Sequence, residues 1–432
     1  MSKAIVVCPS IKGEVANYSR TIEARIAEAT SLCCAINLNI VQAIPLNVNG
    51  ARPATVIGSG QMSEIAEIGK ANDVEVVVFD CALTPMQQRN LEVGMSCKVI
   101  DRSALILEIF GERANTREGI LQVEIAALNY QKSRLVRSWT HLERQRGGFG
   151  FLGGPGESQI ETDRRLIRER IILLQKQLDK VVKTRGLHRR VRDDVPYPNI
   201  ALIGYTNAGK STLFNLLTSA EVLAKDALFA TLDPTTRKVR LPEGMEILIS
   251  DTVGFIANLP TQLIAAFRAT LEEVRQADLL LHVRDITHPD THAQKADVLG
   301  VMQTIFEGAE DSMPPIIEVW NKSDMADDVL RENLHIYRQN PVAISAITGY
   351  GVADLQHAIE SHLIELLYQN VHYVLPNDAG AQLAWLYRHG MVEELQQDER
   401  QMQVQAKLSA ANIARFANIF DMQASPQQTA LI

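Results

Sequence analysis

The stretch NIALIGYTNAGKSTLFNLLTS occupies residues 199–219. Its first residues are apolar and predict a buried strand, and those after Ser211 predict a helix. Between them, GYTNAGKS (residues 204–211) matches the pattern G-x-x-x-x-G-K-[ST]. In such a loop the backbone N–H groups and the helix N-terminus cradle a β-phosphate. The stretch therefore predicts a phosphate-binding loop in an α/β domain, in which helices flank a mostly parallel sheet.

A second motif, DTVG, follows the apolar strand MEILIS and begins at Asp251. We expect Lys210 to neutralise the β- and γ-phosphate oxygens and the Ser211 hydroxyl to ligate Mg²⁺. Asp251 can hold the same ion through water. The N–H of Gly254 is then free to sense a γ-phosphate.

Two further motifs point to guanine. NKSD (residues 321–324) follows the strand PPIIEVW, and SAITG (residues 345–349) follows PVAI. The Asp324 carboxylate can accept hydrogen bonds from N1–H and the exocyclic amine of guanine, and adenine has no matching donors. Backbone amides of SAITG can meet the guanine oxygen. Four motifs at the carboxyl ends of strands predict a GTP-binding domain.

Between the first two motifs lies FATLDPTTR, residues 229–237, where a mobile loop with a Mg²⁺-ligating threonine is expected. Thr231, Thr235 and Thr236 all have the required hydroxyl. Spacing and the family resemblance described below favour Thr231, and turn chemistry around Pro234 is the alternative role of the other two.

The predicted site therefore combines the four motifs and this loop. We expect Lys210, Thr231 and Gly254 to act in catalysis, and Ser211 and Thr231 to ligate the metal. The residues expected to contact the nucleotide are Gly204, Tyr205, Thr206, Asn207, Ala208, Gly209, Lys210, Ser211, Phe229, Ala230, Thr231, Leu232, Asp233, Asp251, Thr252, Val253, Gly254, Asn321, Lys322, Ser323, Asp324, Ser345, Ala346 and Ile347.

Phe255 occupies the place where many GTPases carry a glutamine that orients the attacking water. Its ring makes no conventional hydrogen bond to water, so we expect slow hydrolysis by the protein alone and a complementary group from a partner. The alternative, that Phe255 only packs against the switch helix, is compatible with this. Asn207 stands where some GTPases use an asparagine to hold K⁺ beside the phosphates.

The N-terminal residues alternate short apolar runs with helical stretches, which predicts a small α/β domain. The expected strands are residues 4–9, 36–45, 55–58, 74–80 and 97–100, and the expected helices are 21–33 and 62–71. From Val371 the tail predicts a strand, a helix, two strands and a short helix.

Two heptad-spaced apolar series predict a pair of long antiparallel helices. The members are Leu121, Ile125, Leu128, Leu135, Trp139 and Leu142, then Ile160, Ile167, Ile171, Leu174, Leu178 and Val181. The glycine-rich break GGFGFLGGPG (residues 147–156) should form the tip, with Phe149, Phe151 and Leu152 exposed or folded back. Arginines flank the tip on both arms, where they can pair with phosphates: Arg144, Arg146, Arg164, Arg165, Arg168 and Arg170.

Charge is distributed unevenly along the chain. Residues 131–195 hold 16 Lys and Arg against 8 Asp and Glu, whereas the whole chain has a net charge of −8. A basic segment on an acidic protein suggests contact with a polyanion such as RNA, although a solvated helical surface also explains it.

Bulk properties exclude several classes of protein. No apolar run approaches the roughly 18 residues of a membrane span, and no export signal is evident. The five cysteines have spacings that fit neither zinc nor a disulfide framework. We expect a cytoplasmic monomer.

These motifs together resemble the HflX family of translational GTPases. Two long segments carry the resemblance further: GGFGFLGGPGESQIETDRR (residues 147–165) and DRSALILEIFGERANTREGILQVEIAALNY (residues 101–130). The resemblance spans roughly residues 1–365. It implies a cytoplasmic GTPase that binds the 50S ribosomal subunit, with the hairpin near the peptidyl-transferase region of 23S rRNA. It also implies that stalled or heat-damaged ribosomes are split, with hydrolysis coupled to release.

One segment departs from the family. Members often carry a lysine after paired N-terminal glycines, a feature tied to adenine nucleotides, whereas IGSGQMSEI has Gln61. This departure argues against a second, ATP-binding site.

We expect four parts: an N-terminal α/β domain (1–118), a helical hairpin (119–194), the GTP-binding domain (195–368) and a small α+β domain (369–432). A GTP-gated RNA chaperone acting on rRNA is the alternative function. A partner enzyme of tRNA modification would usually need a further catalytic domain with a cofactor site, and none is recognisable.

Overall fold

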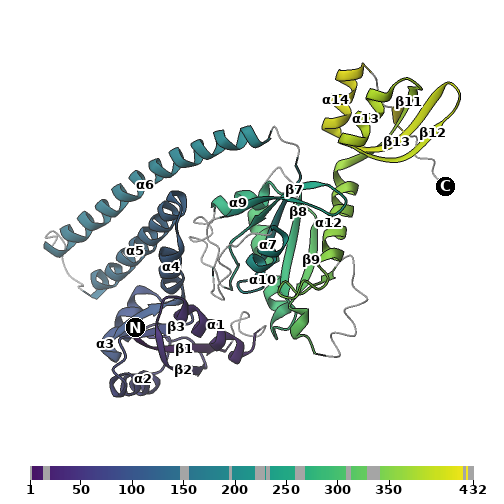
Figure 1. The fold of residues 1–432 in the computed structure, drawn as a ribbon. Coiled ribbons are helices and arrows are strands. Elements are labelled where there is room, and N and C mark those ends of the chain that lie inside the picture. The colour runs from purple at the N-terminus through teal and green to yellow at the C-terminus, as the bar shows by residue number, and fades with distance from the viewer. Residues whose placement is uncertain are drawn as a thin grey trace.

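The computed structural model describes residues 2–12, 20–145, 155–193, 197–218, 229, 234–257, 268–307, 313–327, 341–421 and 425–426. Within these ranges the elements form three sheets and a pair of long helices (Figure 1).

The first sheet consists of four parallel strands in the order β2-β1-β3-β4. Its strands are apolar on both faces, as expected for a parallel sheet covered on both sides. Helices α1 and α4 contribute to the core on one face, and α2 and α3 to the core on the other. The bounds are β1 Lys3–Ile11, α1 Ile22–Ala35, β2 Asn39–Val48, α2 Ser59–Ala71, β3 Val76–Phe79, α3 Pro85–Met95, β4 Lys98–Asp101 and α4 Arg102–Arg113.

One predicted strand is wrong. Residues 55–58 form a turn, in which Val56 makes only an isolated bridge to Arg52 and has a φ of 65°. The Thr55 hydroxyl donates to the Ile57 carbonyl over 2.7 Å and closes this turn locally. Gln61 also has a structural role, because its Oε1 accepts from the Gly58 N–H at the start of α2 (3.0 Å).

The two long helices are α5, Arg117–Gln145, and α6, Pro155–Asp193. They lie side by side (Figure 1), and Leu121, Leu174 and Leu178 are buried between them. These three residues belong to the predicted heptad series, and an ion pair from Arg170 to Glu124 (2.7 Å) also joins the helices. Residues 147–154 of the predicted glycine-rich tip, with Phe149, Phe151 and Leu152, lie outside the described residues, whereas Pro155 and Gly156 begin α6.

The second sheet has six strands in the order β10-β9-β8-β5-β7-β6, of which only β6 runs antiparallel to its neighbour. Helices α7 and α12 pack on one face, and α9 and α10 on the other. The bounds are β5 Asn199–Gly204, α7 Lys210–Thr218, β6 Thr235–Arg240, β7 Glu246–Asp251, α9 Arg268–Arg275, β8 Leu279–Asp285, α10 Thr291–Phe306, β9 Ile316–Asn321, β10 Val342–Ala343 and α12 Val352–Leu367.

A single apolar cluster connects the first two sheets. It includes Ile106 and Phe110 of α4 together with Phe229, Phe255 and Ile256 from the second α/β unit. Phe110 meets Phe229 edge-to-face, with ring centroids 4.7 Å apart. The α1/α4 face of the N-terminal sheet therefore packs directly on the unit that carries the phosphate loop.

The third sheet belongs to a small α+β unit at the C-terminus. Helix α12 leads directly into it (Figure 1), and its strands follow the order β12-β13-β11-β14. Helices α13 and α14 supply Leu386 and Phe416 to its core. The bounds are β11 Tyr368–Pro376, α13 Gly380–His389, β12 Met391–Gln397, β13 Gln401–Ser409, α14 Ala410–Phe420 and β14 Ser425–Pro426. The structure adds the short β14 to the elements that the sequence predicts.

Among the helices that the structure describes, none is both long enough and apolar enough to cross a membrane.

His282 lies in the middle of the second sheet, on β8, with only 2% of its surface exposed. Burial lowers the pKa of His282 from 6.5 to about 4. Below about pH 6.5 the unfolded chain therefore binds a proton at His282. The native state does not bind this proton until the pH falls to about 4. Stability should fall as the pH drops through this window.

We expect His282→Gln to remove this acid sensitivity, because glutamine does not titrate. When the pH is lowered from about 7.5 to about 5, the free energy of unfolding of the parent chain should fall by about 2 kcal/mol because of His282. This loss should be absent from the variant. Urea unfolding followed by Trp320 fluorescence measures this, in a chain with Trp139→Phe and Trp385→Phe. Equal losses in parent and variant would contradict the assignment.

Candidate functional site

The phosphate loop, residues 204–211, connects β5 to α7 at the carboxyl edge of the second sheet. Gly204 has a φ of 151°, and a Cβ there would lie 2.2 Å from the Val283 carbonyl oxygen. Only glycine lets the loop leave β5 so close to β8. The first glycine of the motif is thus required by packing within the sheet.

Asn321 links three of the predicted motifs. Its Nδ2 donates to the Ala208 carbonyl (2.8 Å), and its Oδ1 accepts from the Ala346 N–H (2.9 Å). A Cβ on Gly209, which has a φ of 93°, would lie 2.1 Å from that Nδ2. One buried amide therefore holds the phosphate loop, NKSD and SAITG in a common frame.

NKSD and SAITG, the motifs next to Asn321, combine fixed residues with side chains that are exposed to solvent. Lys322 pairs with Asp285 (2.7 Å), and the Ser323 N–H donates to the Ile344 carbonyl (3.1 Å). Ser345 is fully buried, whereas Asp324 and Ile347 are exposed. The exposed Asp324 carboxylate, next to a backbone that is held in place, can therefore accept hydrogen bonds from the polar edge of a base.

Lys210 is buried within the phosphate loop, near the start of α7. Its Nζ donates to the carbonyls of Gly204 (3.1 Å) and Tyr205 (2.9 Å). Burial lowers the pKa of Lys210 to about 8, although Asp251 acts in the opposite direction. Its ammonium is thus held against loop carbonyls where phosphate oxygens are the expected partners.

Ser211 and Asp251 come together across the site. The Ser211 hydroxyl donates to Asp251 Oδ2 over 2.7 Å. A hydroxyl and a carboxylate are oxygen ligands of the kind that Mg²⁺ prefers, so the pair fits that ion. The described residues contain no cluster of three or more His, Cys, Asp and Glu side chains that could hold a metal by themselves.

The segment DTVGF lies along the phosphate loop. The Phe255 N–H donates to the Gly204 carbonyl (3.1 Å), and the Phe255 carbonyl accepts from the Thr206 N–H (2.8 Å). A Cβ on Gly254 would lie 2.9 Å from Thr206 Cα and 3.1 Å from Lys210 Nζ. Gly254 therefore contacts the loop directly. Thr252 donates to the Leu202 carbonyl, and Val253 is buried.

The Phe255 ring is 3% exposed and belongs to the apolar cluster shared with the N-terminal sheet. The ring thus packs in this cluster, and the expectation that a partner supplies the water-orienting group stays a prediction. Asn207 is exposed and has a φ of 60°.

The loop between the first two motifs is described only at its ends. Phe229 is buried against Phe110. Thr235 and Thr236 belong to β6, where Thr236 exchanges a hydrogen bond with Ser250 (2.8 Å). Four predicted site residues, Ala230, Thr231, Leu232 and Asp233, lie outside the described residues.

The sequence prediction missed a polar cluster that joins the N-terminal unit to the loop. The Tyr205 hydroxyl donates to Glu28 (2.6 Å) and accepts from Arg20 (3.0 Å) and from the Ala257 N–H (2.8 Å). Because Tyr205 and Glu28 are separated by 177 positions, no local pattern could reveal the contact.

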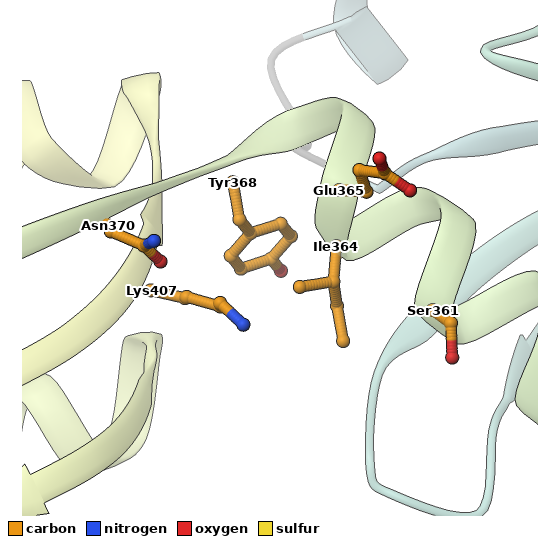
Figure 2. A pocket seen from close by; sticks show the side chains of 6 residues that line it. All are labelled: Ser361, Ile364, Glu365, Tyr368, Asn370 and Lys407. Carbon is orange, nitrogen blue, oxygen red and sulfur yellow. The ribbon is translucent and has the colours of Figure 1, made fainter. Parts of the chain in front are cut away.

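A pocket of about 440 Å³ lies elsewhere, where α12 meets the C-terminal sheet (Figure 2). Its lining combines Tyr368, Ile364 and Lys407 with Ser361, Glu365 and Asn370. None of these residues belongs to the nucleotide motifs.

Four family models match the chain in succession. They are described as GTP-binding GTPase N-terminal (residues 23–111), GTP-binding GTPase middle region (113–192), 50S ribosome-binding GTPase (199–322) and HflX C-terminal domain (333–424).

Relatives match over most of their length. GTPase HflX of Magnetococcus marinus is 50% identical over 374 residues, 86% of this chain and 84% of that protein. GTPase HflX of Escherichia coli is 42% identical, over 88% of this chain and 89% of that protein. A Sulfolobus solfataricus GTP-binding protein solved with GDP is 22% identical, covers 85% of this chain and 100% of that one, and has a TM-score of 0.45. The chain belongs to the HflX family, and it is a GTPase.

Proposed function

We propose that the chain is a ribosome-associated GTPase that binds the 50S subunit and splits stalled or stress-damaged 70S ribosomes. The observation that carries this proposal is that Asn321 joins the phosphate loop, NKSD and SAITG in one site, in a chain that also has a basic helical hairpin. The protein acts in the cytoplasm as a monomer, and its four parts are divided at residues 118, 194 and 368.

Within the site, Lys210 and the Gly254 N–H bind the phosphates. The Asp324 carboxylate accepts hydrogen bonds from guanine. Ser211 and Thr231 would hold Mg²⁺, and the bound ion would neutralise charge on the phosphates. The pairing of Ser211 with Asp251 supports this assignment, since it places two oxygen ligands at the loop. Asn207, which is exposed at the loop, would hold K⁺ near the phosphates.

The burial of Phe255 supports a role for a partner in hydrolysis. Its ring contributes no polar group to the site, and it is 3% exposed within an apolar core. The water-orienting function therefore has to come from elsewhere, and groups added in trans can accelerate this chemistry by roughly 10³–10⁵-fold. The ribosome supplies such groups and orders the loops on either side of the γ-phosphate.

The hairpin supports RNA as the docking partner. Exposed cations line α6: Arg165, Arg168, Arg170, Lys176, Lys180 and Lys183. Cations on a long helix can pair with phosphates of an rRNA backbone without reading its sequence. The glycine-rich tip then approaches 23S rRNA near the peptidyl-transferase region. A GTP-gated RNA chaperone, the alternative, would bind naked rRNA or precursor particles in preference to mature 50S subunits.

Ribosomal stimulation is tested by steady-state GTP hydrolysis, alone and with purified 30S, 50S or 70S particles. We expect strong stimulation by 50S and 70S and little by 30S. Arg165→Glu with Arg168→Glu should raise the 50S concentration for half-maximal stimulation by roughly tenfold and leave hydrolysis without ribosomes unchanged. Lys70→Glu on α2 is the charge-reversal control. No stimulation by any particle would favour the RNA-chaperone alternative.

Guanine selection is tested by Asp324→Asn. The amide loses one acceptor position and gains a donor, so GDP affinity should fall at least about tenfold. Xanthosine diphosphate, which has an oxygen in place of the exocyclic amine, should bind the variant better than GDP does. Asp327→Asn, three positions along the chain, is the matched control. Unchanged GDP affinity in Asp324→Asn would place the base elsewhere.

The K⁺ assignment predicts faster GTP hydrolysis in KCl than in NaCl at equal ionic strength. Asn207→Ala should remove the difference, because the ion loses its side-chain ligand. Equal rates of the parent chain in the two salts would contradict a K⁺ site.

A further inference from the structure

Thr206, the third residue of the phosphate loop, carries a buried hydroxyl group that makes no hydrogen bond. The residue is 7% exposed, and its Oγ1 has no hydrogen-bond partner among the residues that the structure describes. Most buried hydroxyls in proteins are hydrogen-bonded, because burial without a partner destabilises the fold. Valine has the same shape as threonine and would avoid this penalty. Packing alone therefore does not account for a threonine at this position.

The backbone of Thr206 is already paired. Its N–H donates to the Phe255 carbonyl over 2.8 Å, and the Phe255 N–H donates to the Gly204 carbonyl over 3.1 Å. These two bonds fix the direction in which the Thr206 side chain leaves the loop. Because the N–H is used in this way, the hydroxyl is the group that Thr206 can offer to a phosphate.

The Thr206 side chain lies where DTVG meets the phosphate loop. A Cβ on Gly254 would lie 2.9 Å from Thr206 Cγ2 and 3.1 Å from Lys210 Nζ. Cγ2 and Oγ1 are bonded to the same Cβ, so the hydroxyl lies beside the same junction. The Thr206 side chain, Gly254 and the Lys210 ammonium are therefore immediate neighbours.

This junction differs from the part of the loop that is expected to hold the β-phosphate. The β-phosphate is expected at the N–H groups of the α7 N-terminus, which begins at Lys210. The γ-phosphate is expected between Lys210 and the Gly254 N–H, and Thr206 borders this second position. A hydroxyl that donates to an anionic oxygen makes a stronger hydrogen bond than one that donates to a neutral group. A γ-phosphate is therefore a suitable partner for the hydroxyl, and GDP has none.

We propose that the Thr206 hydroxyl donates a hydrogen bond to the γ-phosphate and so selects GTP over GDP. The bond forms with GTP and is lost when hydrolysis and phosphate release remove the acceptor. Thr206 thus adds a side-chain contact to those of the Lys210 ammonium and the Gly254 N–H. The inference deepens the proposed nucleotide site and rests on it, but it does not depend on the ribosomal role. Orientation of the attacking water is left to a partner.

Thr206→Val tests the proposal in the full chain, because it replaces the hydroxyl with a methyl group and keeps the shape of the side chain. The affinity for a non-hydrolysable GTP analogue should fall roughly tenfold, which corresponds to the loss of a hydrogen bond to a charged group. The affinity for GDP, which has no γ-phosphate, should stay within about twofold. Thr206→Ser keeps the hydroxyl and should retain most of the affinity for the analogue. Titration with fluorescent nucleotides measures these constants.

Thr218→Val is the matched control. The Thr218 hydroxyl donates to the Phe214 carbonyl over 2.7 Å, at the end of α7 that is far from the phosphate loop. The control should keep both affinities within about twofold of the parent chain. Parent-like affinity of Thr206→Val for the analogue would overturn the proposal. Equal losses of affinity for the analogue and for GDP would also overturn it, because they would report a change in the whole loop.

The parent chain itself separates this inference from the proposed nucleotide site. If the parent binds neither nucleotide, the site is wrong and the inference falls with it. An experimental structure of the parent with the GTP analogue needs no variant: Thr206 Oγ1 should lie roughly 2.5–3.0 Å from a γ-phosphate oxygen. A separation beyond about 3.5 Å would overturn the proposal and leave the nucleotide site intact.

Discussion

The pairing of Phe255 with the phosphate loop is the contact on which the rest of the arrangement depends. Two backbone hydrogen bonds, to Gly204 (3.1 Å) and from Thr206 (2.8 Å), extend the β5–β7 side of the sheet into the catalytic site. They bring Gly254 against Lys210 and carry the Phe255 ring into the core shared with the N-terminal sheet. One short segment thus belongs both to the nucleotide site and to the domain contact.

The charged cluster inside that contact is balanced. The buried or half-buried cations Arg20, Arg25 and Arg102 face Glu28, Asp80 and Asp297. Burial raises the pKa of Glu28, but Arg102, Tyr205 and Arg20 together outweigh it and lower that pKa. Such a network adds little net stability compared with apolar packing, yet losing one member leaves a buried charge unpaired. It is suited to specifying one docked geometry.

The chemistry of the nucleotide motifs could be predicted from the sequence because it is local. A phosphate loop is encoded by adjacent residues, and Asn321 and Asp324 follow a strand whose end the apolar pattern marks. The strand predicted at residues 55–58 failed, since the apolar pattern cannot distinguish a strand from a turn closed by the Thr55 hydroxyl. The role of Tyr205 could not be predicted from the sequence. It depends on hydrogen bonds with Arg20, Glu28 and Ala257, which come together when the domains pack.

The central claim is that hydrolysis depends on a group from a partner, because the buried Phe255 ring brings no polar group to the site. Single-turnover hydrolysis of bound GTP, with and without saturating 50S subunits, tests this claim most directly. The account predicts that 50S subunits raise the rate constant of the hydrolysis step by roughly 10³-fold or more. A rate constant that 50S subunits leave unchanged would contradict the account.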